Sequence, residues 1–473
     1  MRAFRAKPLR QLRPGRWLPA ASPTTRKLFS TAVLCNPAAA SAATSAANRV
    51  SHGILLEDGS VRVVWGDDHV SSFHERWLFE HCPQRTSGTG GQKADAPAGR
   101  SKTIGTVSAL ADDALADAGG VVVEWACGDR STFAAAWLRT HCYSAAARGA
   151  RSRLRDPVPH ALSAADAIPA VDYDDIMSSE EGALAWTANL ERHGLCVVRG
   201  VPCEEGEVAR LASRVGPVMP SLYGDYWNVR VEPDAINIAY TAQALEPHMD
   251  LAYYESPPGI QLLHCMEFAD SIAGGESTFW DTFVLAELLR EREPEAFATL
   301  VRVCATFQKS HAERENPAQM LYQRPHIVTD NGSADGHVTS VFWSPPFEGP
   351  LDVAPEDVTG YYAAYDAFSA LFADEELAAK HKVELRLRDG DCVTFNQRRL
   401  LHGRNSFQLT EGGTRHFQGC YLNIDDFLSR HRALATVGQV RGGSSPSADR
   451  LAARGALWGV DWTTRISNGS YTC

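Results

Sequence analysis

Residues 414–421 read TRHFQGCY, a run with the composition of a β-strand, and the prediction of the fold starts from it. Residues two apart in a strand face the same side, so Arg415 and Tyr421 are expected to point together into a barrel. Short apolar runs of this kind alternate with Gly- and Pro-rich turns from about residue 195 to residue 430. They predict a mainly β fold with covering helices, an antiparallel barrel or jelly roll rather than a parallel sheet.

Local patterns predict the elements around this stretch. Glu180–His193 is expected to be a helix that ends at Gly194, followed by a strand over Leu195–Arg199. Helices near Thr282–Glu293 and Pro355–Phe372 are expected to cover the barrel. Further strands are expected over Ala235–Tyr240, Ile260–Met266, Val301–Phe307, Asp391–Phe395 and His416–Ile424. Residues 434–473 are rich in Gly, Ser and Arg and predict a flexible C-terminal tail.

Two histidines and one aspartate have the spacing of iron ligands. His248 and Asp250 form an H-x-D pair, and His402 follows after 151 further residues. Two imidazoles and one carboxylate make up the 2-His-1-carboxylate triad of non-haem iron, which leaves other coordination positions open. The alternative is a hydrogen-bonded loop histidine, because sixteen histidines make H-x-D pairs common in this chain.

Arg415 supports the interpretation of the two histidines and the aspartate as an iron site. It follows His402 by thirteen residues and lies on the predicted strand. An iron oxygenase that uses 2-oxoglutarate needs a cation for the distal carboxylate of this cosubstrate, and arginine binds a carboxylate through two parallel hydrogen bonds. The pattern therefore predicts an oxygenase that uses iron(II), 2-oxoglutarate and O2, with His248, Asp250 and His402 as its catalytic metal ligands.

Composition narrows the class of partner. The 473 residues are 44% hydrophobic and 22% charged, as in a globular protein of two or three domains. The formal net charge of -11 argues against nucleic acid as the main partner, and no apolar run is long enough to span a membrane. The eleven cysteines include no C-x-x-C pair, which favours free thiols in a reducing compartment.

The first 150 residues divide into two parts. Residues 1–50 contain nine Arg or Lys and no acid, which predicts a mitochondrial transit peptide, with a disordered basic tail as the alternative. Residues 51–150 contain the pattern W-x11-W-L-x2-H-C twice, at Trp65–Cys82 and Trp125–Cys142. Strand-like runs over Ser60–Trp65 and Gly120–Trp125 open the two units. They predict a small β-rich N-terminal domain ahead of an oxygenase domain at 165–433.

At this point the sequence resembles the γ-butyrobetaine dioxygenase family, whose close relative is trimethyllysine dioxygenase. The resemblance covers about residues 51–433 and rests on PPGIQLLHC at 257–265, GGES at 274–277, RLLHGR at 399–404 and the strand at 415–421. It implies a double-stranded β-helix core with a small N-terminal domain. It also implies iron(II) on the triad, 2-oxoglutarate on Arg415 with Ser277 as a further contact, and ascorbate as a cofactor.

The resemblance also implies how the substrate binds. A quaternary ammonium group cannot donate a hydrogen bond, so proteins bind it through aromatic faces. The aromatic cage of the family falls on Tyr223, Trp227, Tyr240 and Tyr421, and Asn237 falls on a position that contacts the substrate carboxylate. Any one of these aromatics has a core position as its alternative, but four in register favour the cage.

The sequence departs from the family pattern in two places. The family binds structural zinc through three cysteines and a histidine, and the corresponding residues here are Cys82, Gln84, Ser87 and Asp129. Because this set lacks the ligands for a tetrahedral site, no structural zinc is expected. Residues 342–346 read FWSPP where the family has an asparagine that helps to hold the substrate carboxylate.

These observations predict a dioxygenase of the mitochondrial matrix that hydroxylates a small trimethylammonium substrate, converting γ-butyrobetaine to L-carnitine. Three alternatives remain open. They are a trimethyllysine dioxygenase, an oxygenase of the broader taurine-dioxygenase type acting on another small acid, and a non-catalytic metabolite-binding protein of the same fold. The sequence leaves the oligomeric state open, with a homodimer as one option.

Overall fold

The structure, a computed structural model, describes residues 50–85, 103–110, 119–148, 161–164, 166–230, 241–312, 317–408 and 413–440. The predicted transit peptide lies outside these residues except for Val50, the first residue of β1 (Val50–Leu55). The predicted strand Ala235–Tyr240 also lies outside them.

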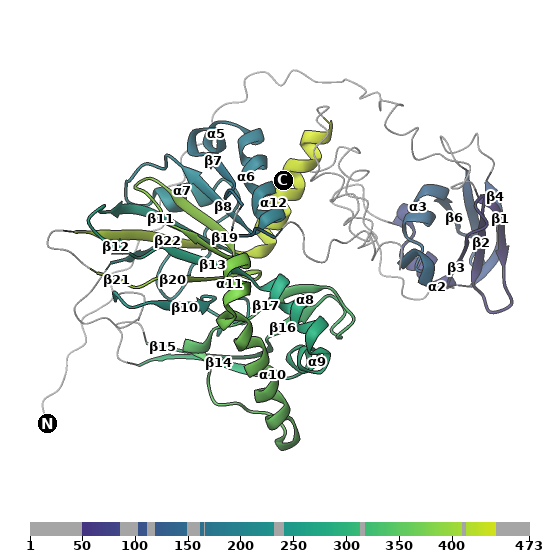
Figure 1. The fold of residues 1–473 in the computed structure, drawn as a ribbon. Coiled ribbons are helices and arrows are strands. Elements are labelled where there is room, and N and C mark those ends of the chain that lie inside the picture. Colours follow the sequence, from purple (N-terminus) through teal and green to yellow (C-terminus); the bar gives the residue numbers. More distant parts are fainter. Residues whose placement is uncertain are drawn as a thin grey trace, which may run out of the picture.

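Two β-sheets form the body of the region from residue 166 onward (Figure 1). One contains, in spatial order, β7 (Ala170–Asp172), β8 (Leu195–Arg199), β19 (Cys392–Asn396), β11 (Ile260–Phe268), β22 (Arg415–Leu422) and β9 (Trp227–Val229). The other contains β10 (Leu245–His248), β20 (Leu400–Arg404), β13 (Ser277–Asp281) and β18 (Lys382–Leu385). Except for β7 with β8, neighbouring strands in these sheets pair antiparallel, which confirms the prediction of a mainly antiparallel fold.

Apolar side chains from the two sheets pack against each other. Phe279 of β13 meets Phe395 of β19 edge to face, with ring centroids 5.1 Å apart. Cys265, Leu400 and Phe417 are buried in the same cluster. Cys265, Leu400 and Phe417 each lie two residues from a pocket-lining residue of the same strand, namely Leu263, His402 and Arg415. Residues two apart in a strand share a face, so one face of each sheet supplies both core and site.

Helices cover the outer face of the six-stranded sheet (Figure 1). As predicted, α6 (Glu180–His193) runs to Gly194, which has a φ of 75°. The indole of Trp186 donates a hydrogen bond of 3.0 Å to Thr394 of β19 and ties the helix to the sheet. Beside α6 lie α5 (Tyr173–Ser178) and α12 (Ile424–Val440).

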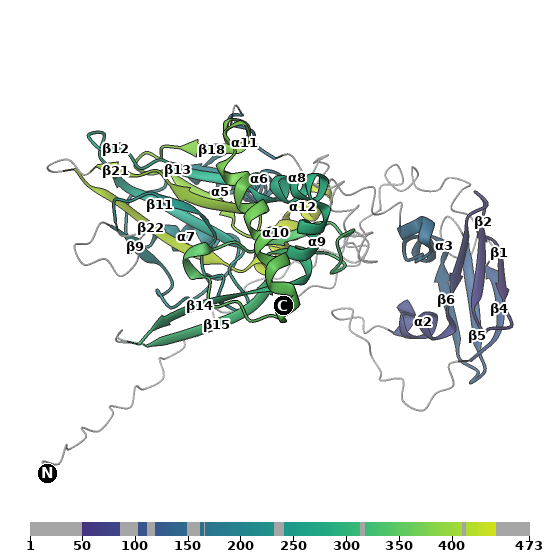
Figure 2. The ribbon, with the colours of Figure 1, turned by 60° about the horizontal axis from the view of Figure 1, so that its bottom comes forward.

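A second group of helices packs together around its own apolar core (Figure 2). It consists of α8 (Thr282–Arg292), α9 (Pro294–Arg302) and α10 (Pro355–Ala373). Two hairpins accompany it, β14 (Cys304–His311) with β15 (Ala318–Pro325) and β16 (Ile327–Thr329) with β17 (Val338–Val341). The remaining elements of this region are α7 (Glu207–Ala212), β12 (Ala273–Gly274), η5 (Pro345–Phe347), α11 (Glu375–His381) and β21 (Phe407–Gln408).

Three predicted boundaries are wrong. Val301 belongs to α9 instead of opening a strand, because it continues the buried face of that helix. Ile424 starts α12 instead of ending a strand. Residues 434–440 continue α12, and Leu434 is buried, so the predicted tail begins too early. In each case a residue expected in a strand or in the tail belongs to a helix that local composition did not predict, α9 or α12.

The N-terminal residues form two three-stranded antiparallel sheets around a core of their own. Their elements are β1, β2 (Val61–Trp65), β3 (Val70–Phe73), α2 (Glu75–Glu80), η2 (Pro83–Arg85), β4 (Ile104–Leu110), β5 (Gly120–Trp125), β6 (Arg130–Ala134) and α3 (Ala135–Thr140). The two repeat units exchange contacts. The Cys82 thiol donates to Ser131 Oγ at 3.3 Å, and Ser71 Oγ donates to Cys142 Sγ at 3.0 Å. The sequence repeat is therefore also a structural repeat.

Nine cysteines fall within the described residues, and all nine are free thiols, which confirms the prediction for them. Most are buried, where they pack as small apolar side chains. The described part of the chain includes no helix with the length and hydrophobicity needed to cross a membrane.

A buried ion pair lies where β13 ends and α8 begins. Arg399 contacts Asp281 at 2.6 Å, and both side chains are less than 5% exposed. Replacing Arg399 by alanine leaves a buried carboxylate without its partner, so Arg399→Ala should lower the free energy of unfolding by about 3–5 kcal/mol. Denaturant unfolding measures this change. The matched control is Arg302→Ala, which breaks the exposed Arg302–Asp357 pair and should leave the midpoint unchanged.

Candidate active site

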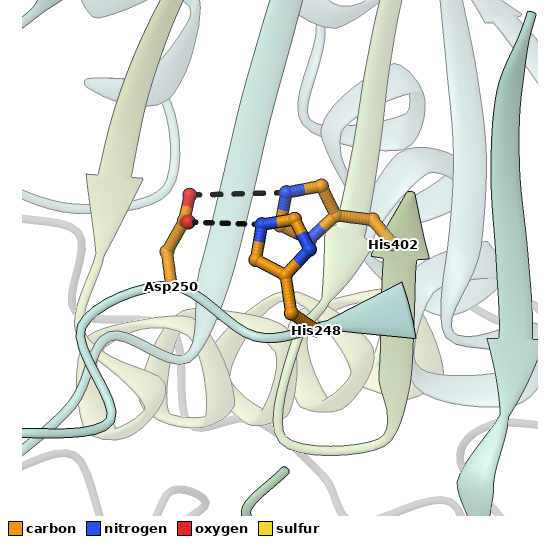
Figure 3. A group of neighbouring side chains, drawn as sticks. All are labelled: His248, Asp250 and His402. Atoms are coloured by element: carbon orange, nitrogen blue, oxygen red, sulfur yellow. Dashed lines mark ion pairs between the residues drawn. The ribbon is translucent and has the colours of Figure 1, made fainter. Parts of the chain in front are cut away.

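His248 and His402 face each other across a strand pair. His248 ends β10 and pairs directly with His402 of β20, with ring centroids 4.4 Å apart. The carboxylate of Asp250 lies 3.6 Å from His248 Nε2 and 3.9 Å from His402 Nε2 (Figure 3). The structure thus brings the three predicted ligands together, each with a donor atom within 4.8 Å of the others.

The backbone between His248 and Asp250 is fixed by the segment that departs from the family pattern. The Met249 N–H donates to the carbonyl of Trp343 at 2.9 Å, and Ser344 Oγ donates to the carbonyl of Met249 at 2.8 Å. Leu251 then has a φ of 58°, a left-handed conformation that is uncommon outside glycine. Convergence of the ligands therefore depends on a turn after Asp250 as well as on strand alternation.

Burial and neighbouring groups set the charges at this site. Burial alone would raise the pKa of Asp250, but its hydrogen bond to His248 and the nearby imidazole of His402 hold the pKa well below its usual range. Burial, and then the neighbouring His248, lower the pKa of His402 to about 3, so this imidazole is neutral near pH 7. A neutral imidazole and an ionised carboxylate are the protonation states that bind a metal ion.

The donor set fits iron(II). Two imidazole nitrogens and a carboxylate oxygen, with room for further ligands in the adjoining pocket, are what non-haem iron centres use. Within the described residues, His248, Asp250 and His402 are the one such group of three potential ligands. The three could hold the ion without contribution from a cysteine.

Buried arginines lie in the same pocket. Arg415 and Arg404 both line it, together with Ser277. Burial, and then the neighbouring Arg404, lower the pKa of Arg415 to about 9. The Nε atom of Arg415 is buried and has no hydrogen-bond partner among the described residues. A buried guanidinium with an unused donor fits an anionic ligand such as a dicarboxylate.

Three of the predicted cage aromatics line this pocket as well. The ring of Trp227 lies 4.2 Å from that of Tyr421 and 6.3 Å from that of Tyr223. Gly419 permits the approach of Trp227, because a Cβ atom at residue 419 would lie 2.6 Å from the indole. The other two predicted substrate contacts, Asn237 and Tyr240, lie outside the described residues.

The pocket also contains residues that sequence reasoning missed, notably Gln261, Tyr253 and Phe347. Gln261 carried a signal, since it is a polar side chain within the apolar strand run Ile260–Met266. Tyr253 and Phe347 carried no such signal in the sequence, because an aromatic residue is usually part of the core. In the altered FWSPP segment, Trp343 is buried in the neighbouring core, whereas Pro346 lines the pocket.

Comparison with known proteins identifies the family. Residues 155–421 match the family described as taurine catabolism dioxygenase TauD, TfdA family. The chain belongs to this family of dioxygenases. A γ-butyrobetaine dioxygenase of Pseudomonas sp. (strain AK-1) is 31% identical to this chain. The match covers 78% of this chain and 92% of the Pseudomonas protein. The γ-butyrobetaine dioxygenase of Homo sapiens is 29% identical, and the match covers 79% of this chain and 94% of the human protein.

A second group of relatives matches over a shorter region. The mitochondrial trimethyllysine dioxygenase of Rattus norvegicus is 27% identical, over 56% of this chain and 61% of its own length. The resemblance inferred from the motifs is thus confirmed, and the γ-butyrobetaine dioxygenases match more of this TauD/TfdA dioxygenase than the rat protein does.

Replacing Arg415 should weaken binding of the cosubstrate specifically. In Arg415→Ala, a buried carboxylate of 2-oxoglutarate would lose its cationic partner, a loss of about 3 kcal/mol, so KM for 2-oxoglutarate should rise about 100-fold. Steady-state succinate release at varied 2-oxoglutarate measures it. The control is Arg210→Ala, an exposed arginine on α7 outside the pocket, which should leave KM unchanged. An unchanged KM in Arg415→Ala would place the cosubstrate elsewhere.

Proposed function

We propose that this dioxygenase uses iron(II) and 2-oxoglutarate to hydroxylate γ-butyrobetaine to L-carnitine. One observation carries the proposal, namely that a single pocket is lined by the histidine and aspartate ligand set, by the buried Arg415 and by the aromatic rings of Trp227 and Tyr421. These groups suit a metal ion, an anionic cosubstrate and a quaternary ammonium group respectively. The relatives named γ-butyrobetaine dioxygenase, which match over more than nine-tenths of their lengths, support the same substrate.

Each set of residues has its own task in the reaction. His248, Asp250 and His402 hold iron(II). When bound together with 2-oxoglutarate and O2, the metal supplies the oxidation of a C–H bond, with succinate and CO2 as the other products. Arg415 binds the distal carboxylate of 2-oxoglutarate, with Ser277 as a further contact. The phenylalanines around Arg415 keep water away from this ion pair and so strengthen it.

The aromatic residues orient the substrate. Tyr223, Trp227 and Tyr421 present rings to the trimethylammonium group, each desolvated ring contributing about 0.5–2 kcal/mol. Tyr240 completes the cage, and Asn237 contacts the substrate carboxylate, as the resemblance implies. With both ends held, one C–H bond of the substrate is positioned next to the metal, and this positioning selects the site of hydroxylation.

Trimethyllysine is the second candidate substrate, because it carries the same trimethylammonium group. One observation favours it, since Glu246 lines the pocket and is a possible acidic partner for an α-amino group. Relatives named trimethyllysine dioxygenase match over a smaller part of their length. We therefore rank γ-butyrobetaine first.

The proposal also covers the domain architecture and the localisation of the enzyme. The two sheets that share the pocket support a double-stranded β-helix as the core. The repeat region at residues 51–150 forms an N-terminal domain without structural zinc, since only Cys82 remains of the expected zinc ligands. Residues 1–50 direct the chain to the mitochondrial matrix, which their composition and the mitochondrial relatives support.

A direct assay separates the candidate substrates. The purified chain with iron(II), ascorbate, O2 and 2-oxoglutarate should release succinate in proportion to added γ-butyrobetaine and should form carnitine. Trimethyllysine in a parallel reaction should give little succinate above the rate without substrate. Preference for trimethyllysine would reverse the ranking, and no stimulation by either compound would contradict a trimethylammonium substrate.

Gly419 should be needed for the cage. In Gly419→Ala the new Cβ atom displaces the Trp227 ring, since the two would otherwise be 2.6 Å apart. Loss of one cation–π face, about 1–2 kcal/mol, should raise KM for γ-butyrobetaine about 10-fold with little change in KM for 2-oxoglutarate. Gly360→Ala in α10 is the matched control, because no atom lies within 4 Å of its new Cβ. Equal KM values in both variants would remove Trp227 from the cage.

A further inference from the structure

We propose that Gln261 and Tyr421 are paired positioning residues that hold Asp250 as a one-oxygen metal ligand and link this ligand to the aromatic cage. This inference rests on the proposed metal site and extends it to two side chains that would not touch the metal. Both line the pocket, and both are about 1% exposed.

The strand register creates the pair. Gln261 of β11 and Tyr421 of β22 are direct cross-strand partners, so their side chains lie next to each other on the face that lines the pocket. Gln261 Nε2 donates to Asp250 Oδ2 at 2.7 Å, and Tyr421 Oη donates to the same oxygen at 2.8 Å. Two neutral donors on adjacent strands thus converge on one carboxylate oxygen.

The two hydrogen bonds make the oxygens of Asp250 unequal. Oδ2 receives both of them and lies 3.9 Å from His402 Nε2, whereas Oδ1 lies 3.6 Å from His248 Nε2 and receives neither. Hydrogen bonds from neutral groups to a carboxylate are strong in a buried site, and they fix its rotation about the Cβ–Cγ bond. Oδ1 therefore keeps its lone pairs for the metal, and the ligand needs little reorganisation when the metal binds.

Asp250 is also fixed from its backbone. Its N–H donates to Gln397 Oε1 at 3.0 Å, and Gln397 is fully buried just beyond β19. Glutamines near two neighbouring strands, β11 and β19, therefore hold the side chain and the main chain of one ligand. Glutamine suits this position because it donates hydrogen bonds without adding charge next to a carboxylate.

Tyr421 connects this arrangement to the substrate. Its ring lies 4.2 Å from Trp227 while its hydroxyl contacts Asp250. One residue thus offers a face to the trimethylammonium group and a hydrogen bond to the metal ligand. A substrate in the cage would contact Tyr421, the side chain that also orients Asp250. Occupation of the cage and the coordination geometry of the metal would therefore be coupled.

Metal affinity tests the positioning role without using the reaction. The full chain, freed of metal by a chelator, would be titrated with Co(II) alone, whose visible absorption bands report its coordination. Tyr421→Phe and the near-isosteric Gln261→Met should each weaken Co(II) binding about 10-fold, the usual effect of removing a partner from a metal ligand. The Co(II) bands should also shift, since the carboxylate is free to rotate.

The matched control is Tyr173→Phe, which removes a tyrosine–carboxylate hydrogen bond of 2.6 Å to Glu207, outside the pocket. It should leave the Kd for Co(II) and the absorption bands unchanged. Thermal unfolding of each variant verifies that it is folded, and Tyr421→Phe carries the test if Gln261→Met is not. Wild-type affinity and bands in a folded variant of either residue would overturn the proposal.

A second readout tests the link to the cage. Tyr421→Phe keeps the aromatic ring, so KM for the trimethylammonium substrate should change less than threefold, a small part of a cation–π contribution. The ratio of succinate to hydroxylated product should rise above one, because cosubstrate turnover is no longer matched to substrate position. A ratio that stays at one would overturn the link. Failure of the proposed substrate would leave the Co(II) result intact, so the two failures can be told apart.

Discussion

The antiparallel pairing of β11 with β22 is the constraint on which the site depends. This register sets Gln261 opposite Tyr421 at one end of the strands and Phe268 opposite Arg415 at the other. This one strand pair therefore brings into the pocket both the side chains that contact Asp250, Gln261 and Tyr421, and the guanidinium of Arg415, which fits a dicarboxylate. A slip of one residue would turn these side chains to the opposite face of the sheet, where helices cover it. Hydrogen bonding along the strands and apolar packing on the outer face together exclude that slip.

The pairing of β10 with β20 positions two of the proposed metal ligands in the same way. It sets His248 opposite His402, although the two residues are far apart in the chain. Asp250 then reaches the imidazoles because the chain turns at Leu251 and because Trp343 and Ser344 fix the backbone of Met249. The segment that lacks the asparagine implied by the resemblance thus has a structural role, since Trp343 and Ser344 hold the loop that carries Asp250, a proposed ligand.

Sequence reasoning succeeded where a pattern is local. Alternation along TRHFQGCY predicted that Arg415 and Tyr421 share a face, and both line the pocket. The helix α6 spans the predicted residues and ends at Gly194, and the structure adds a side-chain cap at Ser179. Reasoning failed at Val301, Ile424 and Leu434, because it did not predict the helices α9 and α12 to which these residues belong. Val301 and Leu434 are buried, and burial against the rest of the domain is not visible in local composition. Sequence reasoning also gave Tyr421 a role in the cage alone, whereas its hydroxyl contacts Asp250.

Residue chemistry and spacing along the chain were sufficient to predict the metal ligands, an arginine for an anion and the strand periodicity, because each of these depends on residue types at fixed intervals. The family resemblance added the cage aromatics. Only the tertiary structure decided which side chains share one pocket, and it revealed Gln261, Tyr253 and Phe347 there. The physical reason is that cross-strand register and packing between sheets join segments separated by more than a hundred residues, as with Gln261 and Tyr421. Such contacts leave no periodic trace in the sequence.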